Sequence, residues 1–532
     1  EMFIPQSVDQ MMSKPITGSA KGTRRQHMRQ QSVEFFMAPV KGKEQRTRCR
    51  DLLFAILFVA QFVTIIWAGM SYGAAGVYTT SHSHASDVSS DLMYSSNGDV
   101  QNSPDDTEDL ASKLGHLADE MKSGESLTID YFNVLRLSAY AGLFAGGLSA
   151  LALIFMTILA ERVIQMSLVF SIALSFIWGT TGIGFFPQSF VPITGLFALL
   201  LCVGYTLIVW DRIPFASANV KTALIGLKEN IGVVIIAFLM MGLMQCWCLW
   251  SVYTSVGIYN TIKQCEGDEC MSKGMTSLIL TGLIVSFYWT FEVFMNIVQV
   301  TVSSTVGVWW ASSNYSKSHA ICRGLNRALV FSFGSICLGS LFTTPIQLVR
   351  QVAESFRPQR NEENALLCLQ ECLLCVQECV FAYMDDLSQS FNHWAYTYVG
   401  LYGYGFRDAG KNATLLFEKR GWTKIAADSL LINVLFIFSL IIGGTTGFFA
   451  LVIETREGLV FTSLGSPEVT SFLIGTVIGL VMSSVLLSLV TSAVSTVIIR
   501  FAGSPREFEF HHGRLSKEMC AAWREVWPGC LD

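Results

Sequence analysis

The chain has 532 residues, of which 51% are hydrophobic and only 14% are charged. This balance and the positive mean hydropathy exclude an ordinary set of water-soluble domains and indicate a chain that lies mostly in lipid. The net charge of −5 hides an asymmetry, because residues 1–51 carry ten Lys and Arg against five acids, whereas residues 77–130 carry two Lys against eleven acids.

The basic segment 1–51 is expected in the cytosol, because Lys and Arg are retained on the cytoplasmic side of membranes. Its expected partner is the anionic inner leaflet, so no nucleic-acid partner is predicted. The first apolar run begins at Leu52 and is too long for a signal-peptide core, so 52–78 is predicted as a signal anchor and first spanning helix. The acidic loop 79–130 follows on the other side and has too few apolar residues to build its own core.

Long apolar stretches recur along the rest of the chain, and a bilayer core needs roughly 20 apolar residues per helix. They predict an all-α polytopic transmembrane bundle of about ten helices, with both termini in the cytosol. The predicted spans are 52–78, 131–160, 163–186, 190–210, 231–258, 275–301, 326–349, 366–400, 426–453 and 469–499. The region 131–500 then holds nine helices with a cytosolic amphipathic segment at 401–425, and residues 501–532 form a cytosolic tail.

The predicted span 366–400 is the least regular, because four acidic residues and one histidine interrupt it. They are Glu371, Glu378, Asp385, Asp386 and His393. A lipid-facing helix would not tolerate these side chains, so this segment is expected to face other helices or water, or to lie partly outside the bilayer. If it does not span, the last helices run in the opposite direction.

The cysteines predict packing and one disulfide rather than a metal centre. Cys368, Cys372, Cys375 and Cys379 share one helical face but extend over about 16 Å, so one metal ion cannot touch all four. Close helix packing is the expected role, with lipidation as the alternative. Cys265 and Cys270 lie in a loop expected outside the cytosol and are predicted to form a disulfide.

Ordered motifs in the second half resemble the choline transporter-like family, the plasma-membrane choline transporter-like proteins with their fungal-type branch. The first group resembles that family's sixth helix and consists of Trp289-Thr290, Glu292, Asn296, Val300-Thr301, Gly307 and Trp309-Trp310. The second group resembles its next helix and consists of Phe333-Gly334-Ser335, Leu338–Leu341, Gln347 and Arg350. The third group is Asn392, Ala395-Tyr396, Tyr402-Gly403, Phe406 and Asn412-Ala413. The chain departs from the family pattern at Arg407-Asp408 and before Pro505.

The resemblance implies a secondary, ATP-independent transporter of choline or a related amine in the plasma membrane, with an organelle membrane as the alternative. Its implied partners are the lipid bilayer, a small-molecule cation and, for exchange, protons. A non-transporting subunit or scaffold that binds other membrane proteins is the competing hypothesis. No cofactor or catalytic residue is expected, because no enzyme motif stands in a supporting context.

A quaternary ammonium cannot donate a hydrogen bond, so its site needs aromatic faces that each contribute about 0.5–2 kcal/mol. Trp247, Trp250 and Tyr253 are spaced three apart on one helix face, and Tyr288 with Trp289 on the next span is expected to face them. These five aromatic residues are candidate substrate contacts. The alternative is an aromatic belt at the membrane interface.

Glu292 lies in the middle of a predicted span among apolar residues, where a carboxylate is costly unless it is paired, protonated or hydrated. It is a candidate counter-charge for an amine cation or a candidate proton acceptor. Asn296 and Gln299 lie within reach along the same helix and complete the predicted substrate site. The alternative is a plain hydrogen bond between helices.

Small residues indicate close helix contacts in two spans. Gly334, Ser335, Gly339 and Ser340 form one small face. Gly443, Gly444 and Gly447 are predicted to break the helix at 426–453 and expose backbone groups, as in transporters. Plain contact motifs or hinges are the alternative for these glycines.

Overall fold

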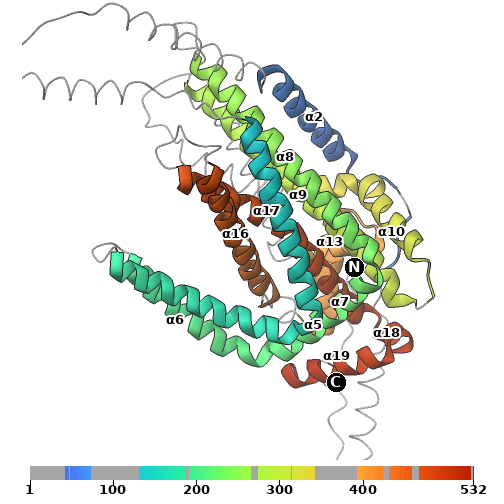
Figure 1. Ribbon diagram of the computed structural model, residues 1–532. Coiled ribbons are helices and arrows are strands. Elements are labelled where there is room, and N and C mark those ends of the chain that lie inside the picture. Colours follow the sequence, from blue (N-terminus) through green and yellow to red (C-terminus); the bar gives the residue numbers. More distant parts are fainter. Residues whose placement is uncertain are drawn as a thin grey trace, which may run out of the picture.

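The structure is a computed structural model. It describes residues 42–46, 48–73, 131–185, 191–264, 273–312, 314–341, 392–422, 430–457, 467–528 and 531. Every regular element within these ranges is a helix, so the predicted all-α class is confirmed. Figure 1 shows these helices as an elongated bundle with one arm that projects from its side.

Seven helices of the described part are long and apolar enough to cross a membrane, or eight if a pair bent by 64° is one span. Four of them are α2 (Leu52–Ala68) with its π-helical extension η2 (Gly69–Gly73), α5 (Tyr131–Phe185), α8 (Ile231–Gln264) and α9 (Lys273–Ala311). The others are α6 (Val191–Val209) continued through η3 (Trp210–Arg212) into α7 (Ile213–Glu229), α16 (Leu430–Glu457) and α17 (Pro467–Gly503). The bent pair joins α10 (Lys317–Asn326) and η4 (Arg327–Phe331) to a helix at Phe333–Leu341. A polytopic bundle is therefore confirmed.

Two predicted spans, 131–160 and 163–186, form the single element α5, which is broken at Leu159 (φ −130°, ψ 39°). The predicted span 366–400 lies outside the described residues except for its last part, which belongs to α13 (Asn392–Tyr402). The predicted count of ten thus stays a prediction. Cys265, Cys270 and the four cysteines between 368 and 379 also lie outside the described residues, so the structure gives the predicted disulfide no support.

The break at Leu159 turns the second half of α5 out of the bundle, where it packs against α6 and forms the projecting arm (Figure 1). Large apolar side chains on α6 are open to the surroundings, including Leu196 (62% exposed) and Leu200 (65% exposed). Such a surface is unfavourable in water and favourable in hydrocarbon, because lipid tails solvate it. The arm is therefore a lipid-facing part of the fold.

Helix α17 runs through the centre of the bundle and contacts α5, α7, α8, α9, α13 and α16. Its closest neighbour is α16, and glycines make that approach possible. A Cβ at Gly447 of α16 would lie 2.2 Å from Thr476 Oγ1, and one at Gly479 of α17 would lie 2.8 Å from Gly443 Cα. The prediction that Gly443, Gly444 and Gly447 break the helix is wrong, because α16 is continuous from Leu430 to Glu457. Gly443 and Gly447 instead let two helices touch backbone to backbone.

One end of the bundle carries the shorter, more polar helices. They include α14 (Phe406–Arg420), α18 (Pro505–His511) and α19 (Gly513–Val526). Two indole donors fasten this end: Trp309 Nε1 bonds to Glu229 Oε2 at 2.9 Å, and Trp523 Nε1 of α19 bonds to Asn219 Oδ1 of α7 at 3.0 Å. Figure 1 places α18 and α19 at the same end as the first described residues.

An N-terminal strap, residues 42–46 and 48–51, crosses this end before α2 begins. Its backbone bonds to two later elements, from Gln45 N to Tyr402 O at 2.8 Å and from Arg50 N to Phe331 O at 3.3 Å. Asp51 Oδ2 then accepts a 2.5 Å hydrogen bond from Ser335 Oγ. The small face predicted around Gly334 and Ser335 thus receives the strap.

Candidate functional site

The predicted polar residues of α9 lie on one side of the helix and reach other helices of the bundle. Glu292, Asn296 and Gln299 follow each other at intervals of four and three residues, which keeps them on a shared face. Asn296 and Gln299 are buried, at 6% and 4% exposed. Since buried amides need partners, the neighbours of this face define the candidate site.

Asn296 donates from Nδ2 to Ser340 Oγ at 3.0 Å. The same serine oxygen lies 3.5 Å from the hydroxyl of Tyr396 on α13. The hydroxyl of Tyr396 is also close enough to the Glu292 carboxylate for the two groups to interact electrostatically. An amide, two hydroxyls and an aromatic ring therefore meet where α9, α13 and the helix Phe333–Leu341 come together, and the Glu292 carboxylate lies within electrostatic range of them.

A second polar connection runs from α9 through α13 to α17. Gln299 donates from Nε2 to the backbone carbonyl of His393 at 2.8 Å, and Nε2 of His393 is hydrogen-bonded to Ser495 Oγ of α17. The hydroxyl of Ser488, also on α17, lies 3.5 Å from the backbone carbonyl of Met295. Hydroxyl side chains on α17 thus continue the polar face of α9.

The predicted aromatic residues of α8 face α2 instead of this polar face. Trp247 stacks on Phe62 with the ring centroids 4.6 Å apart, and Trp250 Nε1 lies 3.4 Å from the carbonyl of Ile65. Tyr253 fills the space beside Gly73, where a Cβ would lie 2.0 Å from its ring. The first helix therefore covers all three predicted residues.

Trp289 lies between the aromatic residues that contact α2 and the polar face of α9. Tyr288 belongs to neither of these groups. The ring of Trp289 packs edge-on against Phe58 of α2 at 5.4 Å, while its Nε1 donates to the carbonyl of Cys337 at 3.0 Å. Tyr288 is 36% exposed, and its ring contacts Phe287. The structure thus brings together Trp289, Glu292, Asn296 and Gln299, and places Tyr288 apart from them.

Four residues of this region were not predicted as site residues: Gln61, Ser340, His393 and Tyr396. Gln61 of α2 donates from Nε2 to Thr290 Oγ1 at 3.2 Å and accepts from Ser286. The sequence carried a signal for each of them. Gln61 is a lone amide in an apolar span, and His393 interrupts a second predicted span. Ser340 and Tyr396 belong to the motifs that resemble the choline transporter-like family. Among the described residues no cluster of three potential metal ligands occurs.

The fold and this buried polar face define the chain as a polytopic α-helical membrane protein with a polar site inside its bundle. A sequence model of the family described as plasma-membrane choline transporter matches residues 193–505, more than half of the chain. The chain therefore belongs to the plasma-membrane choline transporter family. Family membership makes it a membrane transporter, as the motif resemblance implied.

Similar curated proteins include several from fungi. Protein PNS1 of Yarrowia lipolytica is 27% identical over 428 residues, which cover 75% of this chain and 72% of the relative. Protein PNS1 of Gibberella zeae is 22% identical over 68% of this chain and 72% of its own length. Protein PNS1 of Neurospora crassa is 26% identical over 62% of this chain and 61% of its own length. The fungal-type branch of the predicted resemblance is thus represented among the similar proteins.

Proposed function

We propose that the chain is an ATP-independent transporter of choline or a related organic cation in the plasma membrane, and that its substrate binds beside Glu292. The observation that carries this proposal is the buried cluster of Asn296, Ser340 and Tyr396, one helical turn from Glu292 on the same face of α9 and within electrostatic range of its carboxylate. A carboxylate attracts the positive charge, and an aromatic ring binds methylated nitrogen without needing a hydrogen-bond donor.

The surrounding residues support this assignment of roles. Glu292 is the counter-charge, and Tyr396 supplies an aromatic face. Asn296 and Gln299 hold α9 against its neighbours through hydrogen bonds to Ser340 and His393. Because α9, α13 and α17 meet at this site, a shift of one helix group against the others would alter access to the cation from each side.

Uptake of labelled choline into proteoliposomes tests the proposal. Glu292→Gln keeps the size of the side chain and removes its charge, and we expect at least a tenfold loss of kcat/KM, equivalent to about 1.4 kcal/mol. Tyr288→Leu is the control, because Tyr288 lies apart from the site and its loss should leave KM unchanged. A folded wild-type protein without saturable flux of choline or any other amine would instead favour the scaffold hypothesis.

Two substitutions of Tyr396 separate cation binding from structural hydrogen bonding. Tyr396→Phe keeps the ring and should keep KM within about twofold, whereas Tyr396→Leu should raise KM by about 5- to 30-fold through the loss of one cation–π face. If both variants behave alike, the ring does not bind the cation. The proton-acceptor role of Glu292 requires that Glu292→Gln also lose its response to a pH gradient.

A further inference from the structure

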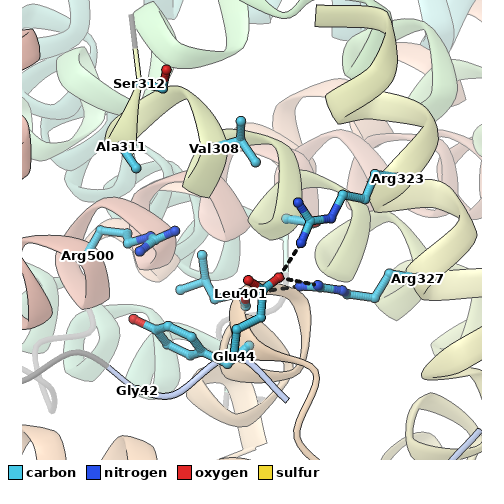
Figure 2. A pocket seen from close by; sticks show the side chains of 11 residues that line it. Gly42, Glu44, Val308, Ala311, Ser312, Arg323, Arg327, Leu401 and Arg500 are labelled. Carbon is cyan, nitrogen blue, oxygen red and sulfur yellow. Dashed lines mark hydrogen bonds and ion pairs between the residues drawn. The ribbon is translucent and has the colours of Figure 1, made fainter. Parts of the chain in front are cut away.

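A second polar site lies at the end of the bundle that carries the strap. It is a cavity of about 200 Å³ between the strap, the last turns of α9, α13 and α17, and the bent pair of helices. Its lining residues include three arginines and one carboxylate, and Figure 2 shows them around a common space. They are Arg323, Arg327, Arg500 and Glu44.

Glu44 of the strap occupies one side of this cavity. Its Oε1 accepts hydrogen bonds from Arg323 and, at 3.1 Å, from Nη2 of Arg327. Arg327 is 8% exposed in its side chain and is held in place by bonds from Nη1 to the carbonyls of Gly400 and Leu401 at 2.7 and 3.0 Å. One carboxylate oxygen is thus bound between two guanidinium groups, the arrangement in which arginines bind oxyanions.

Arg500 lines the opposite side and forms no ion pair with an acidic residue in the described part of the chain. It is 7% exposed, its Nη2 donates to the carbonyl of Gly307 at 2.9 Å, and its guanidinium lies 5.6 Å from the ring centre of Tyr402. Its Nε and Nη1 atoms are buried and make no hydrogen bond of good geometry with the described residues, although the guanidinium is close enough to the Tyr402 hydroxyl to interact with it weakly. A buried guanidinium with two unused donors is costly unless an anion completes it.

We propose that this cavity is a binding site for a phosphate group, carried by a lipid headgroup or by a small soluble molecule, and that Glu44 competes with the phosphate for Arg323 and Arg327. Three arginines against one carboxylate leave an excess of positive charge. Phosphate offers several oxygens in a geometry that guanidinium forks bind in pairs. The cavity is large enough for a phosphate group. At about 30 Å³ per water, its volume equals that of roughly six to seven waters.

Because Glu44 belongs to the strap, a ligand bound in this cavity affects how the strap is held. The strap is tied to α13 and η4 by backbone hydrogen bonds, and its acidic anchor in the cavity is Glu44. A phosphate that takes the two arginines must displace Glu44 and loosen the strap. Phosphate binding and strap docking therefore oppose each other, and by linkage each weakens the other by the same factor.

Binding of inorganic phosphate to the full chain in nanodiscs of neutral lipid is the first measurement. Glu44→Gln removes the competing charge, and we expect phosphate to bind at least about tenfold more tightly than to the wild type. Arg500→Gln should weaken binding about tenfold or more in either background. Glu518→Gln and Arg524→Gln change the same charges at the same end of the bundle without lining the cavity, and they should leave phosphate affinity unchanged.

Nanodiscs that contain a phosphoinositide lipid distinguish the source of the phosphate. The strap should become more sensitive to proteolysis when free phosphate or the phosphoinositide binds. Arg500→Gln should abolish this increase. A response to free phosphate indicates a soluble ligand, and a response to the lipid alone indicates a headgroup, and both support the site. The proposal is overturned if Glu44→Gln, which leaves all three arginines in place, binds neither form more tightly than the wild type.

Discussion

Gln299 on α9 donates its side-chain amide to the backbone carbonyl of His393 on α13, 2.8 Å away. The bond joins a residue inside one long span to the first turn of a short helix. Because the acceptor is a backbone carbonyl, this hydrogen bond from Gln299 does not require a particular side chain at position 393. The register between these two helices also sets how close Tyr396 comes to Glu292.

Gln299→Leu should therefore destabilise the bundle by about 1–2 kcal/mol, because a buried carbonyl loses its donor. Thermal unfolding of the full chain in detergent measures the loss. Thr455→Val is the control, because Thr455 is exposed and its hydroxyl bonds to carbonyls of its own helix. The loss should persist in a His393→Ala background, since that variant keeps the carbonyl. An unchanged melting temperature for Gln299→Leu would contradict the assigned bond.

Two glycines of α16 that are three positions apart, Gly444 and Gly447, should respond differently to the same substitution. Gly447→Ala puts a Cβ 2.2 Å from Thr476 Oγ1 and 2.8 Å from the carbonyl of Phe472, whereas a Cβ at Gly444 meets nothing within 4 Å. Gly447→Ala is expected to cost about 1–3 kcal/mol through overpacking. Gly444→Ala should be neutral or gain up to about 1 kcal/mol from helix propensity. Equal melting temperatures for the two variants would rule out the tight α16–α17 contact.

Removal of the Phe62 ring should release α2 from α8. Phe62→Ala loses the stack on Trp247, and a loss of about 1–3 kcal/mol is expected for a partly buried ring. Val63→Ala is the control on the same helix, because Val63 is 56% exposed. Hydrogen exchange of α2 in nanodiscs should rise for Phe62→Ala alone. Equal exchange in both variants would show that the stack does not hold the helix.

The contact between α19 and α7 should weaken in acid. The hydrogen bond from Lys221, above all, lowers the pKa of Glu518. A carboxylate with a lowered folded-state pKa stabilises the fold above its unfolded pKa of about 4.3, and that contribution disappears as the pH falls through the folded pKa. Both side chains are largely open to solvent, so Glu518→Gln should cost no more than about 1 kcal/mol at pH 7. The difference in stability between variant and wild type, followed by Trp523 fluorescence, should shrink as the pH falls from 7 through the folded-state pKa of Glu518. A difference that does not change with pH would refute the ion pair.

The sequence predicts a polytopic bundle of long apolar helices because crossing a bilayer is a local requirement on composition. It also predicts the polar face of α9, since the intervals of four and three residues between Glu292, Asn296 and Gln299 place them on one side of a helix. It does not predict that Phe58 and Phe62 cover Trp247 and Trp289, because helices that are apolar all round carry no signal for which side meets a neighbour. The burial of Arg500 and the pairing of Glu44 with Arg327 are equally invisible, since their partners come from distant parts of the chain.

The strap has a consequence for how the protein is made. Glu44 and Arg323 are separated by 279 positions in the sequence, and Tyr402 comes later still. A nascent chain exposes its amino end long before the residues that receive it have left the ribosome. Docking of that end is therefore among the last steps of biogenesis, and it marks a molecule whose later helices have already been assembled.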